Sequence, residues 1–232
     1  MKQLSTRSLA FVCVFAAFHV TLYLISPPIL WRNWAIYLAP IEAIILGPWA
    51  GFLAALIGST IGRIVLPNPL WMFGIIAEPL SVLTAGFLVR RTWKPVVAIY
   101  AAMFLAYFAS PLGRALPVWP LSDAVIAFCL VYPAAKLSKN LFGENVKLLP
   151  VSLAIVSFIT VATDGMARVF LLVPAGLYSV LFMTQDMVLT AFVGGGINSF
   201  IEDALVIFVS LVVGVPIVLT LRKVLSLQKP LS

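Results

Sequence analysis

Long apolar runs, separated by short stretches with proline, glycine or charge, follow one another along the whole chain. The runs lack the strict alternation of apolar and polar residues that marks the strand of a membrane β-barrel. In lipid, every backbone polar group must find its partner within the protein, so these runs are predicted to be helices. We expect helices over residues 8–26, 33–47, 49–66, 71–89, 95–110, 121–138, 149–172 and 197–221.

The composition places these helices in a membrane. Hydrophobic residues make up 62% of the chain and charged residues 10%, whereas a soluble domain is about half apolar and about a quarter charged. One globular core cannot cover this much apolar surface, which excludes a soluble enzyme, a disordered chain and a coiled coil. We therefore expect an all-α, multi-pass bundle of about eight spans that contacts membrane lipid and forms one transmembrane domain over residues 1–232.

Basic residues predict the orientation of the chain, because lysine and arginine accumulate on the cytoplasmic side. Lys2 and Arg7 precede the first span, which is longer than the apolar core of a cleaved signal. Basic groups within 90–94, 136–147 and 222–229 lie on the same side when the spans between them are even in number. We expect both termini in the cytoplasm and the protein in the cell membrane. The scattered basic residues do not predict nucleic-acid binding.

The apolar stretch 176–193 is difficult to place, because it contains Asp186 and would make the number of spans odd. We expect it to be a re-entrant or surface element on the outer side. The three glycines at 194–196 are then expected to form a flexible start to the last helix.

Charged side chains within the expected spans fall mainly in the outer half of the membrane. Such groups are costly in lipid and often mark functional sites, so the pattern is typical of an outward-open pocket for a polar solute. Structural neutralisation is the alternative, since Asp164 and Arg168 are four residues apart on one helix face. For Arg32, between Trp31 and Trp34, a role as an interfacial anchor is equally open.

Signatures of catalysis are missing. His19 is the single histidine and has no Cys, Asp or Glu nearby on its own helix face, whereas a catalytic zinc takes three protein ligands. Zinc-protease, nucleophile-elbow and P-loop motifs are absent. We expect no catalytic residues, no metal and no cofactor, and we interpret His19 as a helix-packing residue. Cys13 and Cys129 are expected to pack within helices without a disulfide.

Small residues recur every four positions on two of the expected helices, a spacing that lets helix backbones approach closely. This pattern favours packing within the chain, and docking against another membrane protein is the alternative. The two stripes are Gly51, Ala55 and Ser59 with the pair Gly58 and Gly62, and Cys13, Ala17 and Thr21.

The segment ILGPWAGFLAALIG, from Ile45 to Gly58, resembles the turn between the second and third helices of the substrate-binding S components of energy-coupling factor (ECF) transporters. The stretch from Asn198 through Glu202 to Pro216, which closes with two basic residues, is similar to the last helix of that family. Members have about six spans, so the resemblance implies a six-helix core elaborated over 95–138 or 149–193.

The resemblance implies a subunit that captures a vitamin or a related small solute outside and is not itself an enzyme. A transmembrane coupling protein and a pair of ATPase subunits would drive release inside. The matching partner contact is Cys13, Ala17 and Thr21, where Cys13-x3-Ala17 replaces the Ala-x3-Ala of the family. The matching substrate-binding positions are Trp31, Arg32, Asn33, Asn68, Trp71, Glu78, Asp164, Arg168, Asn198 and Glu202.

Two other classes of function remain open from the residues alone. A self-sufficient ion-coupled secondary transporter would use the intramembrane carboxylates of Glu42, Glu78 and Asp164 to relay protons or sodium. An intramembrane enzyme, or a scaffold for a larger complex, is the third class.

Overall fold

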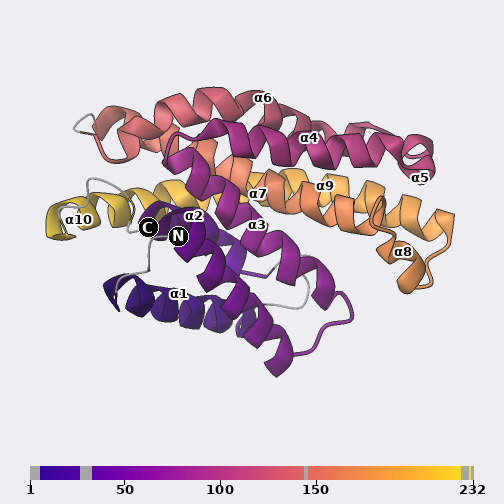
Figure 1. Cartoon of the computed structure of the whole chain (residues 1–232), viewed down its shortest axis with the longest axis horizontal. Helices are drawn as coiled ribbons and strands as arrows, with labels where there is room; N and C mark the ends of the chain where they lie inside the picture. The colour runs from indigo at the N-terminus through magenta and orange to yellow at the C-terminus, as the bar shows by residue number, and fades with distance from the viewer. Residues whose placement is uncertain (1–5, 27–32, 144–145, 226–229, 231–232) are drawn as a thin grey trace.

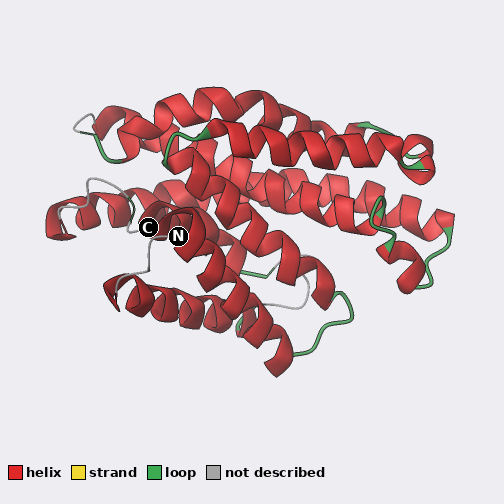
Figure 2. Ribbon diagram, viewed as in Figure 1, coloured by secondary structure: helices red, strands yellow, loops and turns green. Residues whose placement is uncertain are grey.

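The computed structural model describes residues 6–26, 33–143, 146–225 and 230, and within them every regular element is a helix (Figure 2). The expected all-α architecture is confirmed. The helices are α1 (Thr6–Leu24), α2 (Ala35–Val65), α3 (Trp71–Val89), α4 (Trp93–Ala109), α5 (Pro111–Ala115), α6 (Ser122–Leu137), α7 (Leu149–Leu172), α8 (Leu177–Val180), α9 (Gln185–Val209) and α10 (Val215–Leu225). Short 3-10 helices cover Trp119–Leu121, Ser138–Leu141 and Val146–Leu148, and a π-helical turn, Ser210–Gly214, joins α9 to α10.

Five helical segments of the described chain are long and apolar enough to cross a membrane. They are Ala35–Val65, Trp71–Val89, Trp119–Leu141, Val146–Leu172 and Gln185–Lys223, and the shorter segments Ser8–Leu24 and Trp93–Ala109 are also apolar. Large apolar side chains cover much of the outside of the bundle. These features are those of a helical membrane protein.

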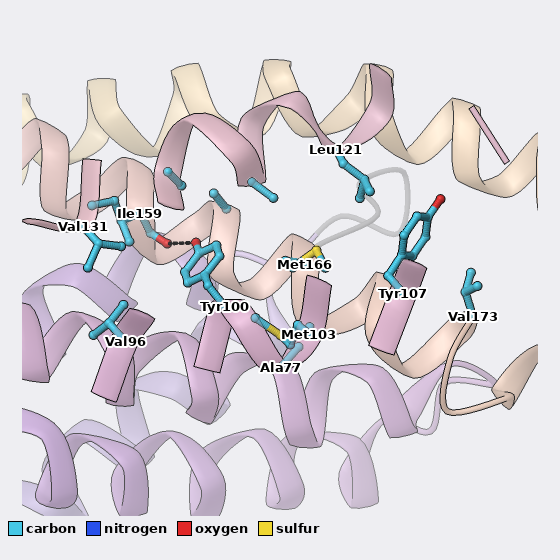
Figure 3. Packing of buried hydrophobic residues seen from close by; sticks show 14 of the residues in the cluster. Ala77, Val96, Tyr100, Met103, Tyr107, Leu121, Val131, Ile159, Met166 and Val173 are labelled. Carbon is cyan, nitrogen blue, oxygen red and sulfur yellow. Dashed lines mark hydrogen bonds between the residues drawn. The ribbon is translucent and has the colours of Figure 1, made fainter. Parts of the chain in front are cut away.

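Helix α7 lies at the centre of the bundle, where it packs against α3, α6 and α9. On one side α4 and α6 run next to each other, and on the other side α1, α2 and α3 pack together (Figure 1). The largest buried apolar cluster joins α3, α4, α6, α7 and α9 (Figure 3). In it the Tyr100 hydroxyl lies 2.9 Å from the hydroxyl of Thr163, and the ring of Tyr107 stacks on Phe192 at a centroid distance of 6.0 Å.

Gly47 reverses the direction of the chain within α2. Its φ of 79° lies in the left-handed region that favours glycine. Glu42, before Gly47, pairs with His19 of α1, and Gly58, after it, packs directly against the same His19. A straight helix would separate residues 42 and 58 by about 24 Å. The range 35–65 therefore consists of two limbs that fold back on each other, which confirms the break expected between 33–47 and 49–66.

The small residues on the second limb of α2 serve packing within the chain. A side chain at Gly58 would meet the Cβ of His19 at 2.5 Å and the carbonyl oxygen of Ala16 at 2.9 Å, and one at Gly62 would meet the ring of Tyr23. Ala55 and Ser59 are fully buried. The pair Gly58 and Gly62 therefore lets α1 approach α2 closely, as its spacing predicts, whereas Gly51 of the same stripe faces Val82 of α3.

The expectation for 176–196 was wrong in one respect. Residues 177–180 do form a separate short helix, but residues 185–196 belong to α9 and run on without a break into the last helix, triglycine included. Each glycine weakens a helix by about 1 kcal/mol, but in an apolar setting the alternative of unpaired backbone groups costs more. Gly196 also has a packing role, because a side chain there would meet Pro120 at 2.5 Å.

Candidate functional site

A cavity of about 740 Å³ lies among α2, α3, α6, α7 and α9. Part of its wall comes from the connection between α2 and α3, at residues 66–70, and from residues 181 and 183. Apolar side chains such as Phe73, Leu121, Met166 and Phe192 line it, as do the polar side chains Tyr23, Ser26, Asn33, Arg63, Asn68, Asp123, Arg168, Asn198, Ser199 and Glu202.

Glu78 of α3 is the centre of the polar contacts behind this wall. Its carboxylate is buried and accepts hydrogen bonds from Arg63 Nη2 (2.5 Å) and Nη1 (3.3 Å) on the second limb of α2. Asn33 Nδ2 donates to Oε1 at 2.8 Å, and Arg168 Nη2 of α7 donates to the same oxygen at 3.4 Å. A single carboxylate thus orients three side chains that line the cavity.

The guanidinium of Arg168 is oriented from within its own helix as well. Arg168 Nε donates to Asp164 Oδ2 at 2.7 Å, one helical turn earlier, and Nη2 donates to Oδ1 at 3.4 Å. The i,i+4 pairing predicted from the sequence is therefore present, and Arg168 also lines the cavity. The charge of Arg168 is therefore neutralised by Asp164 within the helix, and the same side chain also forms part of the pocket wall.

His19 extends the polar cluster away from the cavity. Its Nε2 lies 3.0 Å from Glu78 Oε2, and its Nδ1 lies 3.6 Å from Glu42 Oε2. All three side chains are buried. The interpretation of His19 as a helix-packing residue was incomplete, because it has carboxylate partners on α2 and α3, although none on its own helix.

A second part of the cavity wall is built around Asp123, at the start of α6. Its Oδ2 accepts a hydrogen bond from Ser199 Oγ of α9 at 2.6 Å, and its Oδ1 accepts one from the backbone N–H of Ala124 at 2.6 Å. Gly196 lies one turn before Ser199 and lets α9 approach Pro120. This close packing of helices brings Ser199 within reach of Asp123.

The structure divides the predicted binding residues into groups. Glu78 and Asp164 lie behind the wall, where they support the two arginines. Trp71 begins α3, is 49% exposed and does not line the cavity. Trp31 and Arg32 lie outside the described residues. Those that do line the cavity are Asn33, Asn68, Arg168, Asn198 and Glu202.

Sequence reasoning did not place Arg63, Tyr23, Asp123 and Ser199 in the site. Arg63 carries the clearest signal in retrospect, because it is a charge within an apolar run and Gly74 leaves room for it on the neighbouring helix. Asp123 lies at the end of an expected span, where a charge is unremarkable. Tyr23 packs under Arg63, whose Cζ lies 4.9 Å from the ring centroid.

Neither a metal centre nor a disulfide is found in the described part of the chain. No three side chains of His, Cys, Asp or Glu in it are grouped so as to hold a metal ion. Cys13 and Cys129 are free thiols.

The stripe on α1 predicted to contact a partner faces outward. Cys13, Ala17 and Thr21 are all exposed, whereas His19 and Tyr23 on the other face of the helix are buried against α2. The stripe therefore takes no part in the packing of α1 against α2.

Comparison with known proteins shows a distant similarity to an archaeal protein. An uncharacterised protein of Methanocaldococcus jannaschii is 28% identical over 163 residues, a match that covers 66% of this chain and 55% of that protein. The chain therefore spans about half the length of this relative. The chain matches no family model, and no solved structure matches it.

Proposed function

We propose that this chain is the membrane-embedded substrate-binding subunit of an ECF-type importer, which captures a vitamin or a related small solute from outside. The observation that supports this function is the cavity of about 740 Å³. Small-molecule sites span roughly 300–1,000 Å³ and combine apolar walls with a few oriented polar groups. Arg63 and Arg168, held from behind by carboxylates, fit that description.

The proposed orientation agrees with the position of the cavity. With both termini in the cytoplasm of a multi-pass protein of the cell membrane, residues 66–70 and 181–183 connect spans on the outer side. Both segments contribute to the cavity wall. The pocket is then open to solute from outside, and the basic residues at 90–94 and 222–223 lie inside.

The proposed partners are a transmembrane coupling protein and a pair of ATPase subunits. The exposed stripe of Cys13, Ala17 and Thr21 on α1 supports a contact with another membrane helix, since small residues permit close approach. The absence of a P-loop motif from the sequence fits a division of labour in which ATP is hydrolysed elsewhere.

The direct test is to purify the chain in mild detergent, denature it and identify the released small molecules by mass spectrometry. We expect one vitamin-like compound in a stoichiometric amount. Arg168→Ala and Glu202→Ala should each retain less of it, and Asp186→Asn, an exposed acid on α9 outside the cavity, should retain the wild-type amount. Full retention by both cavity variants would contradict the assigned pocket.

A self-sufficient ion-coupled transporter is the second candidate. The contacts of His19 with Glu42 and Glu78 favour it, because three buried titratable side chains in a row can carry a proton from the cavity wall inward. Uptake of the released compound into liposomes that contain this chain alone, driven by a proton gradient, would support the second candidate. Uptake only with a coupling protein, ATPases and ATP would support the importer.

A further inference from the structure

The two walls of the cavity differ in how their charges are balanced. On the first wall, the guanidinium of Arg63 meets both oxygens of Glu78, and that of Arg168 meets Asp164 and Glu78. The positive charges there already have carboxylate partners within the protein. An anionic ligand would have to compete with these carboxylates and would be repelled by them.

On the second wall, the donors that Asp123 receives from the described residues are neutral. Its two oxygens accept hydrogen bonds from the Ser199 hydroxyl and the Ala124 N–H, each at 2.6 Å. Within the described residues it forms no ion pair with Lys, Arg or His. Asp123 is 5% exposed, so its carboxylate is removed from bulk water. A buried carboxylate without a cation is costly, and a positive charge placed next to it is strongly favoured.

The surroundings of Asp123 are those of a preformed site. Leu121 and Ala124 beside it and Phe192 of α9 belong to one buried apolar cluster and also line the cavity. The contact of Gly196 with Pro120 fixes the spacing of α9 from this end of α6. The Ser199 hydroxyl then orients the carboxylate. Apolar walls lower the local dielectric constant and strengthen the attraction of Asp123 for a cation.

We propose that the solute bound in this cavity is an organic cation whose positively charged nitrogen pairs with Asp123, while its apolar body contacts the cavity walls. This inference rests on the proposed binding function and adds the charge of the ligand to it. Asp123 is the residue that determines the preference for positive charge, and Ser199 positions its carboxylate. Glu202, one turn beyond Ser199, also lines the cavity.

The test uses three probes of nearly equal shape: benzamidinium, which is positive, benzamide, which is neutral, and benzoate, which is negative. Each is added at the same concentration to the full chain in detergent, and binding is measured by the shift of the unfolding temperature. We expect benzamidinium to stabilise the protein and to bind at least tenfold more tightly than benzamide or benzoate, in keeping with the strength of a desolvated charge pair.

Two variants tie this preference to the proposed residues. Asp123→Asn keeps the size of the side chain and should remove the advantage of benzamidinium over benzamide. Ser199→Ala keeps the carboxylate, so it should weaken benzamidinium binding and retain the preference for it. Asp186→Asn, an exposed acid on the same helix as Ser199, should behave as the wild type.

The outcomes separate this inference from the proposed function. If benzamide or benzoate stabilises the protein as much as benzamidinium or more, the cation preference is overturned and solute binding still stands. Release of a stoichiometric compound without a cationic nitrogen has the same two consequences. An unchanged preference in Asp123→Asn overturns the role of Asp123. If no probe stabilises the protein and no compound is released from it, the inference and the proposed function both fail.

Discussion

The guanidinium of Arg63 occupies the space that a side chain at position 74 would fill. A Cβ atom added to Gly74 would overlap Nη2 and Cζ of Arg63. Gly74 lies one turn before Glu78 on α3, so the arginine passes over the bare backbone of α3 to reach the carboxylate. The position of a cavity-lining cation thus depends on the absence of a side chain on the neighbouring helix.

Gly74→Ala should therefore displace Arg63 without unfolding the protein, because the end of a flexible side chain moves more easily than a helix. We expect the amount of compound that co-purifies with the protein to fall several-fold, as measured by mass spectrometry after denaturation. Gly194→Ala is the matched control, since a Cβ at that helical position meets nothing within 4 Å. It should retain the compound and gain up to about 1 kcal/mol of stability. Equal retention by both variants would contradict the role of Gly74.

Glu78→Gln should destabilise the protein strongly, because it removes a buried negative charge that faces Arg63, Arg168 and His19. Breaking a buried ion pair at one partner costs about 3–5 kcal/mol. The measurement is thermal or chemical unfolding in detergent, compared with Asp186→Asn, whose acid is exposed. A loss below about 1 kcal/mol, the level typical of surface pairs, would show that Glu78 is not the centre of this cluster.

The sequence predicted where helices begin and end better than it predicted whether neighbouring helical segments join into one helix. The ranges 71–89 and 149–172 match α3 and α7 residue for residue, because proline or charge bounds each apolar run. The prediction for 194–196 failed because local helix propensity disfavours glycine, whereas contact with Pro120 and the apolar setting decide the conformation.

For the candidate site, charges in apolar runs pointed to Glu78, Asp164 and Arg168, which the structure brings together. The partners of His19 were not predictable from its own helix, because Glu42 and Glu78 approach it only once three helices have packed. The role of Asp123 was not predicted from the sequence for a related reason. Its importance depends on which side of α6 faces the cavity, which the sequence pattern does not reveal.

Gly58→Ala should weaken the packing of α1 on α2. The added methyl group would meet the carbonyl oxygen of Ala16 at 2.9 Å and the Cβ of His19 at 2.5 Å, and neither is the free end of a flexible side chain. Overpacking of this kind costs about 1–3 kcal/mol, which denaturant unfolding in detergent can measure. Gly195→Ala, where a Cβ meets nothing within 4 Å, should show no such loss, and an equal loss in both would argue against close contact of these helices.

Arg222→Ala should loosen the end of α10 from the segment that follows α6. The guanidinium of Arg222 donates to the carbonyl oxygens of Asn140 (2.5 Å), Leu141 (2.8 Å) and Gly143 (3.0 Å). Hydrogen bonds from a charged donor contribute about 1.5–3 kcal/mol, so we expect a loss of that order in unfolding experiments. Lys223→Ala removes the neighbouring exposed charge and should leave stability nearly unchanged. A similar loss in both variants would contradict a specific role for Arg222.

The reversal at Gly47 has a consequence for how the protein is assembled. The limb of α2 that precedes it extends only about 18 Å from Ala35 to Leu46, less than the roughly 30 Å of the hydrocarbon layer. The backbone at Gly47 and Pro48 is buried against Gly86 of α3, where a side chain would overlap it. This shelter exists only after the ribosome has synthesised residue 86. We therefore expect the two limbs of α2 to complete their insertion together with α3, as one unit of biogenesis.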